Sequence, residues 1–544
     1  MAEPDLIIHN ARVFRSGPPG SLPGASASAV SVGAGRIQAI GDERQARDWA
    51  GPTTATFDAR GGLIMPGFND AHMHLRDGAI SLDRLDLFGL ASLDAVQDAI
   101  SSYAAARPDQ PWIAGRGWLY AAFPRGMPTR QQLDAAVPGR PAYFECFDGH
   151  SGWANSRALE LAGITGETID PPDGRIVRDA TGQPTGALKE RAVELVDRLL
   201  PVPDDDELPA LFERALRRAA ALGITAVQDA WGRPDELRIL RALEADGRLP
   251  VRFRLALEML PGLDRERHSA RFDGFEALRA EKPDGQRLRT GILKSFLDGV
   301  VEARTAHLLR PYPGTETRGD PRWEDIELRE AVALADERGW QVELHAIGDA
   351  AVRQALDAFA ALGPGRAAAR RHRVEHIETI HRDDLPRFAQ LGVVASMQPM
   401  HAVAGGGQVD VWRDNLDPAV AESGWRLRSL LRSGAVLAFG SDWPVVPIDP
   451  MLEIHAAVRR QTPDGEPSGG WLPEEGVAVA DALAAATWGS AYAEHTERER
   501  GHLAPGAMAD VVVLDRDLLR EDTRAIAGTR VLLTVVGGEV VHAT

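Results

Sequence analysis

The stretch Trp340-Gln341-Val342-Glu343-Leu344-His345 is a mostly apolar, strand-like run that ends in a histidine. A helix-like segment follows it, in which Val352, Leu356 and Phe359 recur at the i, i+4, i+7 spacing of one helix face. The run at 373–376 also ends in a histidine and also precedes helix-like sequence. This pattern is typical of consecutive βα units in a parallel sheet.

The same alternation extends over most of the chain. Further buried-strand runs lie at 224–229, 393–397 and 435–440. Strand–helix alternation over roughly 400 residues predicts an α/β fold with a parallel sheet and helical crossovers. We expect a (β/α)₈ TIM-like barrel, and a doubly wound sheet is the alternative.

Both ends of the chain have the texture of short β-strands instead. Such strands are predicted before residue 60, and again at 510–514 and 531–536. Neither end is long enough to form a stable sheet alone. We therefore expect residues 1–60 plus 497–544 to form one small composite β-sandwich, with the barrel at 61–496 between them.

One segment of the middle region fits the alternation poorly. Residues from about 80 to 220 contain Trp112, Trp118 and Trp153, many prolines and a turn-rich stretch at 170–174. We interpret this segment as an insertion after the first barrel strand.

Composition and charge exclude several classes of protein. The chain has 544 residues, with 61 basic and 79 acidic side chains and a net charge of −18, which argues against nucleic-acid binding. A single cysteine, Cys146, excludes an intrachain disulfide and any multi-cysteine metal site. No apolar run approaches the roughly 18 residues that span a bilayer, and residues 1–5 lack a basic secretory segment. We expect a cytoplasmic protein without a membrane partner; a homo-oligomer stays open.

Histidines gather at the ends of predicted strands. His72 and His74 follow the apolar residues at 64–68, and residues i and i+2 of an extended backbone point to the same side. A chance pair is the alternative for this motif alone. His345 and His376 end successive strands, however, and the C-terminal strand ends of a barrel converge on one face. Four histidines in such positions predict a metal site.

Two further charged residues stand beside apolar strands. Asp442 directly follows the run at 435–440, where a carboxylate can contact a metal, accept a proton from water and protonate a leaving group. A turn or helix-cap aspartate is the alternative. Lys294 lies inside the apolar run 291–296, and an unpaired buried ammonium is costly. It either pairs with a carboxylate such as Asp298, or its amine has a depressed pKa and is modified.

An ordered set of motifs carries a family resemblance. The motifs lie at 66–74, 294–299, 305–306, 344–349, 374–376, 440–444 and 505–510, with two more at 148–156 and 182–186 inside the insertion. In this order the sequence resembles the metal-dependent amidohydrolase superfamily, and specifically its amidohydrolase 3 branch, which includes N-substituted formamide deformylases. The resemblance implies a (β/α)₈ barrel with a β-sandwich built from both termini.

The resemblance also implies roles for the site residues. His72 and His74 would bind one metal ion and His345 and His376 a second, while Lys294, carboxylated by CO₂, would bridge them. Asp442 would be both a metal ligand and the general base. The implied cofactor is two Zn²⁺ per chain, although iron, manganese or cobalt also suit histidine and carboxylate ligands. A mononuclear site that uses His72, His74, His345 and Asp442 is the alternative.

Substrate contacts are predicted from weaker signals. His150 and Trp153 would face the substrate from the insertion, or else form a structural turn, and Arg304 would meet an anionic group, or else be exposed or paired. His401, His455 and His495 are expected to be structural or surface residues.

The predicted function follows from this set. We expect hydrolysis of a non-peptide C–N bond in a small molecule, for example an N-substituted formamide. An ester or lactone substrate, or a catalytically silent binding protein, is the alternative.

Overall fold

The computed structural model describes residues 3–18, 27–123, 126–204, 206–281, 284–403 and 408–544. Within these ranges, eight strands form one parallel sheet in chain order. They are β7 (Phe68–Met73), β14 (Ile224–Gly232), β15 (Arg252–Glu258), β16 (Leu288–Phe296), β17 (Gln341–Ala346), β18 (Arg373–His376), β19 (Val394–Met397) and β20 (Leu437–Phe439). This topology confirms the (β/α)₈ barrel and not the doubly wound sheet.

The first and last strands of this sheet are joined just beyond their C-terminal ends. The backbone N–H of Asp442 donates to the carbonyl of His72 at 2.6 Å, and that of His74 donates to Trp443 at 2.7 Å. Met73 and Trp443 form an isolated parallel bridge. These bonds nearly close the barrel, and they fix Asp442 beside the histidine pair.

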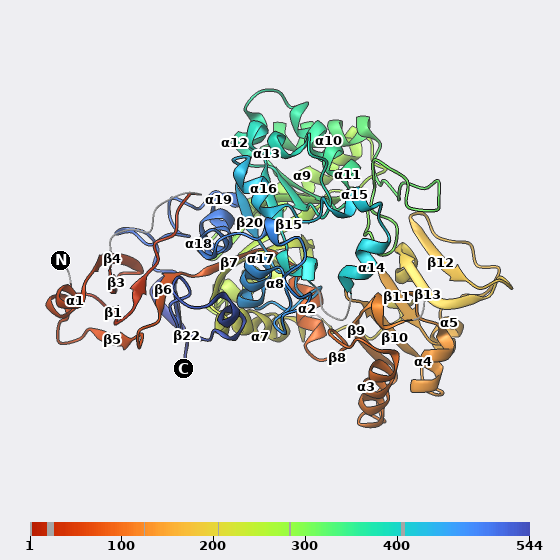
Figure 1. The fold of residues 1–544 in the computed structure, drawn as a ribbon, viewed down its shortest axis with the longest axis horizontal. Helices are drawn as coiled ribbons and strands as arrows, with labels where there is room; N and C mark the ends of the chain where they lie inside the picture. The colour runs from red at the N-terminus through yellow and green to blue at the C-terminus, as the bar shows by residue number, and fades with distance from the viewer. Residues whose placement is uncertain (1–2, 19–26, 124–125, 205, 282–283, 404–407) are drawn as a thin grey trace.

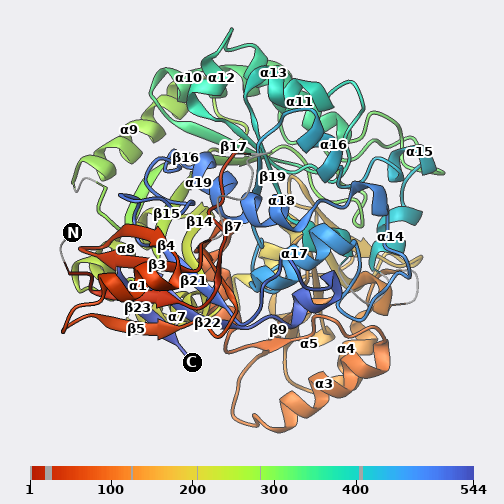
Figure 2. The ribbon, with the colours of Figure 1, turned by 60° about the vertical axis from the view of Figure 1, so that its left-hand side comes forward.

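Helices surround the barrel (Figures 1 and 2). The predicted stripe of Val352, Leu356 and Phe359 lies on α11 (Asp349–Ala360), and all three side chains are buried. Other helices of this shell are α2 (Leu75–Ser81), α7 (Leu208–Ala221), α8 (Pro234–Ala245), α9 (Arg265–Glu281), α10 (Asp325–Glu337), α13 (Leu385–Leu391), α16 (Leu427–Arg432) and α17 (Pro450–Arg459). Further helices are α12 (Arg366–Arg370), α14 (Gln408–Asp414), α15 (Pro418–Ala421), α18 (Val479–Ala484) and α19 (Ser490–Ala493).

Strands from both ends of the chain share one sheet. Its order is β2 (Arg12–Val13), β6 (Leu63–Pro66), β21 (Val511–Leu514), β22 (Val531–Val536) and β23 (Glu539–Ala543). A second sheet is N-terminal throughout, in the order β4 (Arg36–Gly41), β3 (Ala29–Gly33), β1 (Leu6–His9), β5 (Ala55–Asp58), and α1 (Glu43–Trp49) packs on β3. Val32, Ile64 and Val511 share one buried cluster across the two sheets. Strand β6 belongs here although the predicted boundary lies at residue 60.

The insertion forms a six-stranded sheet of its own between β7 and β14. Its order is β12 (Gly174–Arg178), β13 (Pro184–Glu190), β11 (Ser151–Ala154), β10 (Ala142–Cys146), β9 (Ile113–Trp118) and β8 (Leu85–Asp86). Its helices are α3 (Leu93–Ala105), α4 (Arg130–Ala136), α5 (Ser156–Leu161) and α6 (Glu194–Asp197). Since α7 packs on α2 and β14, the insertion ends before that helix. Figure 1 shows it at the opposite end of the molecule from the terminal strands.

Within the described residues, no helix combines the length and the apolar character needed to cross a membrane.

Candidate metal centre

A cavity of about 740 Å³ opens at the C-terminal ends of the barrel strands. Barrel and insertion both contribute to its wall. Its polar lining includes His74, His150, Glu190, Arg322, His345, His376, His401 and Asp442, and its apolar lining includes Phe147, Trp231, Met259, Phe296 and Ile347. In a barrel of this kind, the C-terminal face is where active sites are built.

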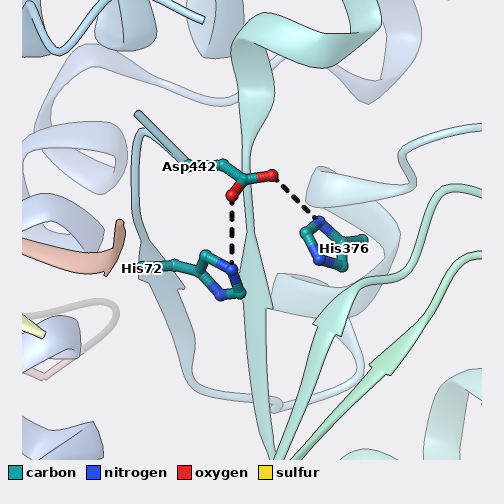
Figure 3. A group of neighbouring side chains, drawn as sticks. All are labelled: His72, His376 and Asp442. Carbon is teal, nitrogen blue, oxygen red and sulfur yellow. Dashed lines mark ion pairs between the residues drawn. The ribbon is translucent and has the colours of Figure 1, made fainter. Parts of the chain in front are cut away.

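Three buried side chains converge on one another (Figure 3), and two of them, His376 and Asp442, line the cavity. His72 Nε2 lies 3.4 Å from Asp442 Oδ1, and His376 Nδ1 lies 3.9 Å from Asp442 Oδ2. One donor atom from each of the three residues lies within 4.8 Å of the others. Such a group has the size and the donor chemistry of a divalent metal site.

The other predicted ligands surround this group. His74 Nε2 lies 3.0 Å from Asp442 Oδ1, and Lys294 Nζ lies 3.5 Å from His72 Nε2. The ring centroids of His345 and His376 are 4.5 Å apart. The structure therefore brings all six predicted ligands together, from five different strand ends.

Unpaired buried nitrogens test whether a metal fits here. His345 Nδ1 and His376 Nδ1 are buried and have no hydrogen-bond partner among the described residues. A buried polar atom without a partner is costly, so each one needs an explanation. A metal ion on these nitrogens would satisfy both, and the residues present therefore fit such an ion.

Burial sets the protonation of the histidines. It lowers the pKa of His72 to about 4, an effect to which the nearby charge of Lys294 adds. It also lowers the pKa values of His345 and His376 well below the usual range. Metal binding requires neutral imidazole, so these rings are ready to bind without releasing a proton near neutral pH.

The contact between Asp442 and His74 shifts the pKa of both side chains. Burial alone would raise the pKa of Asp442, but His72 and His74 bring it below the usual range. Burial alone would lower the pKa of His74, but its contact with Asp442 raises it. Asp442 is therefore a carboxylate at neutral pH, as a ligand or a general base must be.

Lys294 has no carboxylate partner at hydrogen-bond distance within the described residues. Burial lowers the pKa of its amine, although Glu343 and Glu375 oppose the shift. Asp298, the predicted alternative partner, instead accepts hydrogen bonds from the backbone N–H groups of His307, Ile347 and Gly348. The ion pair with Asp298 is therefore not formed, because that carboxylate connects the loops after β16 and β17.

A buried network below the site orients His72. Glu375 Oε2 lies 2.6 Å from His72 Nδ1, and Glu375 Oε1 accepts a hydrogen bond from Arg373 Nε at 2.8 Å. Because a carboxylate only accepts, Nδ1 carries the proton and Nε2 is left for a metal. Burial would raise the pKa of Glu375, but Arg373 and His72 lower it to about 2. Glu375 lies in the sequence motif at 374–376, but the sequence alone indicated no role for it.

His401 lines the cavity, which corrects the expectation that it is a structural or surface residue. It lies in the 3-10 turn η4 (Pro399–Val403) after β19, with Nε2 3.6 Å from Asp442 Oδ2 and Nδ1 3.8 Å from Glu378 Oε1. Its ring is nearly parallel to that of His376. Its position after the strand-like run at 393–397 was the available signal.

Only one of the three residues predicted to contact the substrate lines the cavity. His150 lines the cavity, with its ring centroid 5.6 Å from that of His345. Trp153 does not line it: the side chain is fully buried in the insertion, where Nε1 donates to the Thr129 carbonyl at 2.9 Å. Arg304 does not line it either, since it is exposed and donates from Nε to Asn415 Oδ1. The expected substrate contacts of Trp153 and Arg304 are thus corrected to structural and surface roles.

Comparison with known proteins gives a family match. The model of the Amidohydrolase family matches residues 55–542, which is most of the chain. A protein from Arabidopsis thaliana named LONG AFTER FAR-RED 3 is 32% identical over 553 residues, covering 99% of this chain and 91% of its own. An N-substituted formamide deformylase from Arthrobacter pascens is 30% identical over 546 residues, covering 98% and 97%.

A solved structure shows the same architecture. It is an uncharacterized metal-dependent hydrolase from Pyrococcus horikoshii OT3, 27% identical, with a TM-score of 0.72. The alignment covers 95% of this chain and 99% of that one.

Proposed function

Because the chain belongs to the amidohydrolase family and is similar to a metal-dependent hydrolase of known structure, we propose that this hydrolase cleaves a non-peptide C–N bond of a small amide. The observation that carries the proposal is the convergence of four histidines, Lys294 and Asp442 at one end of the barrel. An N-substituted formamide is the proposed substrate class, supported by the deformylase relative.

The proposed cofactor is a pair of divalent ions, zinc in the first instance. The proposed ligands are His72, His74, Lys294, His345, His376 and Asp442. Carboxylation of Lys294 would turn a buried cation into an anion that the ions neutralise. Its complete burial and depressed pKa support this reaction, because a neutral amine is the form that attacks CO₂.

Asp442 performs the proton transfers of the proposed reaction. When bound, the metal ions supply an acidified water nucleophile and polarise the carbonyl group. The Asp442 carboxylate takes the proton from that water and delivers it to the leaving nitrogen. Both of its oxygens face the site, Oδ1 toward His74 and Oδ2 toward His401, so the carboxylate is held in the cavity wall throughout.

Metal content and bond type test the proposal together. Elemental mass spectrometry on protein purified without added metal or chelator should give about two ions per chain, falling to one or fewer in Lys294→Ala. The metal-loaded protein should then release formate from an N-aryl formamide. Turnover of the matching aryl formate with none of the formamide would overturn amide hydrolysis, and a protein that takes up no metal would overturn the mechanism.

A further inference from the structure

The carboxylate of Glu190 lies at the boundary between the insertion and the barrel. Glu190 ends β13 with φ of 50° and ψ of −136°, a backbone conformation that is strained for a residue other than glycine. Its side chain is only 7% exposed. Strain of this kind persists where the surrounding contacts hold the residue in place.

Three groups hold this carboxylate. Oε2 lies 2.9 Å from His150 Nδ1 and accepts a hydrogen bond from Arg322 Nη2 at 2.6 Å. Oε1 accepts a hydrogen bond from Thr305 Oγ1 at 2.6 Å. Arg322 and Thr305 follow barrel strand β16, whereas His150 and Glu190 belong to the insertion. Glu190 therefore links the barrel to a histidine of the insertion.

The contact with Glu190 determines which atom His150 presents to the cavity. Because the carboxylate can only accept, Nδ1 of His150 is the donor, and Nε2 is the remaining polar atom of the ring. The side chain is 13% exposed and lines the cavity. Its ring lies 5.6 Å from that of His345 and 6.5 Å from that of Phe296, beside the proposed metal ligands.

We propose that Glu190 is a positioning residue that fixes His150, whose Nε2 hydrogen-bonds a polar group of the substrate next to the reacting bond. This inference rests on the proposed function, since it adds a substrate contact to the same site. On this proposal the insertion is part of the active site, because it supplies His150. One oxygen of Glu190 contacts both His150 and the barrel residue Arg322, and this contact joins the insertion to the barrel.

The test separates positioning from mere stabilisation. Glu190→Leu removes the carboxylate oxygen that contacts both His150 and Arg322 while keeping a side chain of similar size, and His150→Phe keeps a ring while removing Nε2. Each variant should lower kcat/KM for the amide about tenfold, the worth of one hydrogen bond, at unchanged metal content. Since Glu190 acts through His150, the double variant should be no worse than His150→Phe. Losses that multiply in the double variant would overturn the proposal.

A matched control and a second readout complete the design. Glu160→Leu removes another insertion carboxylate, 69% exposed and paired with Arg157, and should leave kcat/KM unchanged. Crystal structures of the wild type and of Glu190→Leu should show the His150 ring rotated or displaced in the variant. An unmoved ring would overturn the positioning role of Glu190, whatever the activity of the wild type. A wild type that hydrolyses no amide would instead count against the proposed function.

Discussion

The substitution Glu375→Gln tests whether the buried network controls metal binding. Glu375 contacts His72 Nδ1 at 2.6 Å and Arg373 Nε at 2.8 Å, and all three side chains are buried. Glutamine preserves the volume, but it removes the charge and offers only one accepting oxygen to two donors. His72 then loses the partner that fixes its Nε2 toward the metal.

The size of the effect follows from this geometry. Losing such an orienting partner typically weakens metal affinity by 10–100-fold, or about 1.4–2.7 kcal/mol. Competition with chelators of graded strength measures this affinity. The matched control is Glu343→Gln, because Glu343 lies 3.4 Å from Arg373 Nη1 and has no contact with His72. It disturbs the same buried cation while leaving His72 paired.

The two variants together decide the matter. The reasoning is refuted if Glu375→Gln binds metal as tightly as the wild type. It is equally refuted if Glu343→Gln weakens the affinity as much, because general disturbance of the buried charges would then explain both. Thermal unfolding of the metal-free proteins shows whether either variant fails to fold.

Three further predictions concern other parts of the molecule. Asp442→Asn should lower kcat by 10²–10⁴-fold while at least one metal ion is retained, since the proton acceptor is lost; near-normal turnover would contradict its role. His401→Gln should lower kcat/KM about tenfold at unchanged metal content, and loss of an ion would make it a ligand instead. Arg252→Met should reduce the free energy of unfolding in urea by about 3 kcal/mol, because it leaves the Asp510 carboxylate buried and unpaired, while Arg252→Met/Asp510→Asn should recover most of that loss. Burial would raise the pKa of Asp510, but Arg252 holds it below its usual value. Without Arg252 the pKa of the folded variant's Asp510 rises, so the deficit of Arg252→Met should be largest near neutral pH and should shrink as the pH falls through that raised pKa and the carboxylate takes up a proton.

The barrel and the convergence of the candidate ligands could be predicted because their sequence signals are local. A buried parallel strand is a continuous apolar run, and the helix after it has a periodic stripe such as Val352, Leu356 and Phe359. His345 and His376 stand at the ends of such runs. Once the strands are known to converge, the histidines must be neighbours.

The residues that were missed act across the barrel. Glu375 and Arg373 lie inside β18, and their partners are on other strands: His72 on β7 and Gln228 on β14. No spacing in the sequence encodes these pairs, since barrel closure creates them. The predicted substrate contact of Trp153 was wrong for a related reason. The sequence does not distinguish a tryptophan that lines a cavity from one that is buried in a core.

The proposed metal ligands and the proposed substrate contact lie on different parts of the fold. The proposed metal ligands lie on strand ends, where the backbone bonds of β7 to Trp443 and Asp442 leave little freedom. His150 instead lies in the loop between β10 and β11 of a separate sheet, and it reaches the cavity because Glu190 is held by Thr305 and Arg322. The insertion can therefore change the substrate contact without moving a ligand. Variants in the insertion should alter KM and substrate preference, and variants at the strand ends should alter metal content.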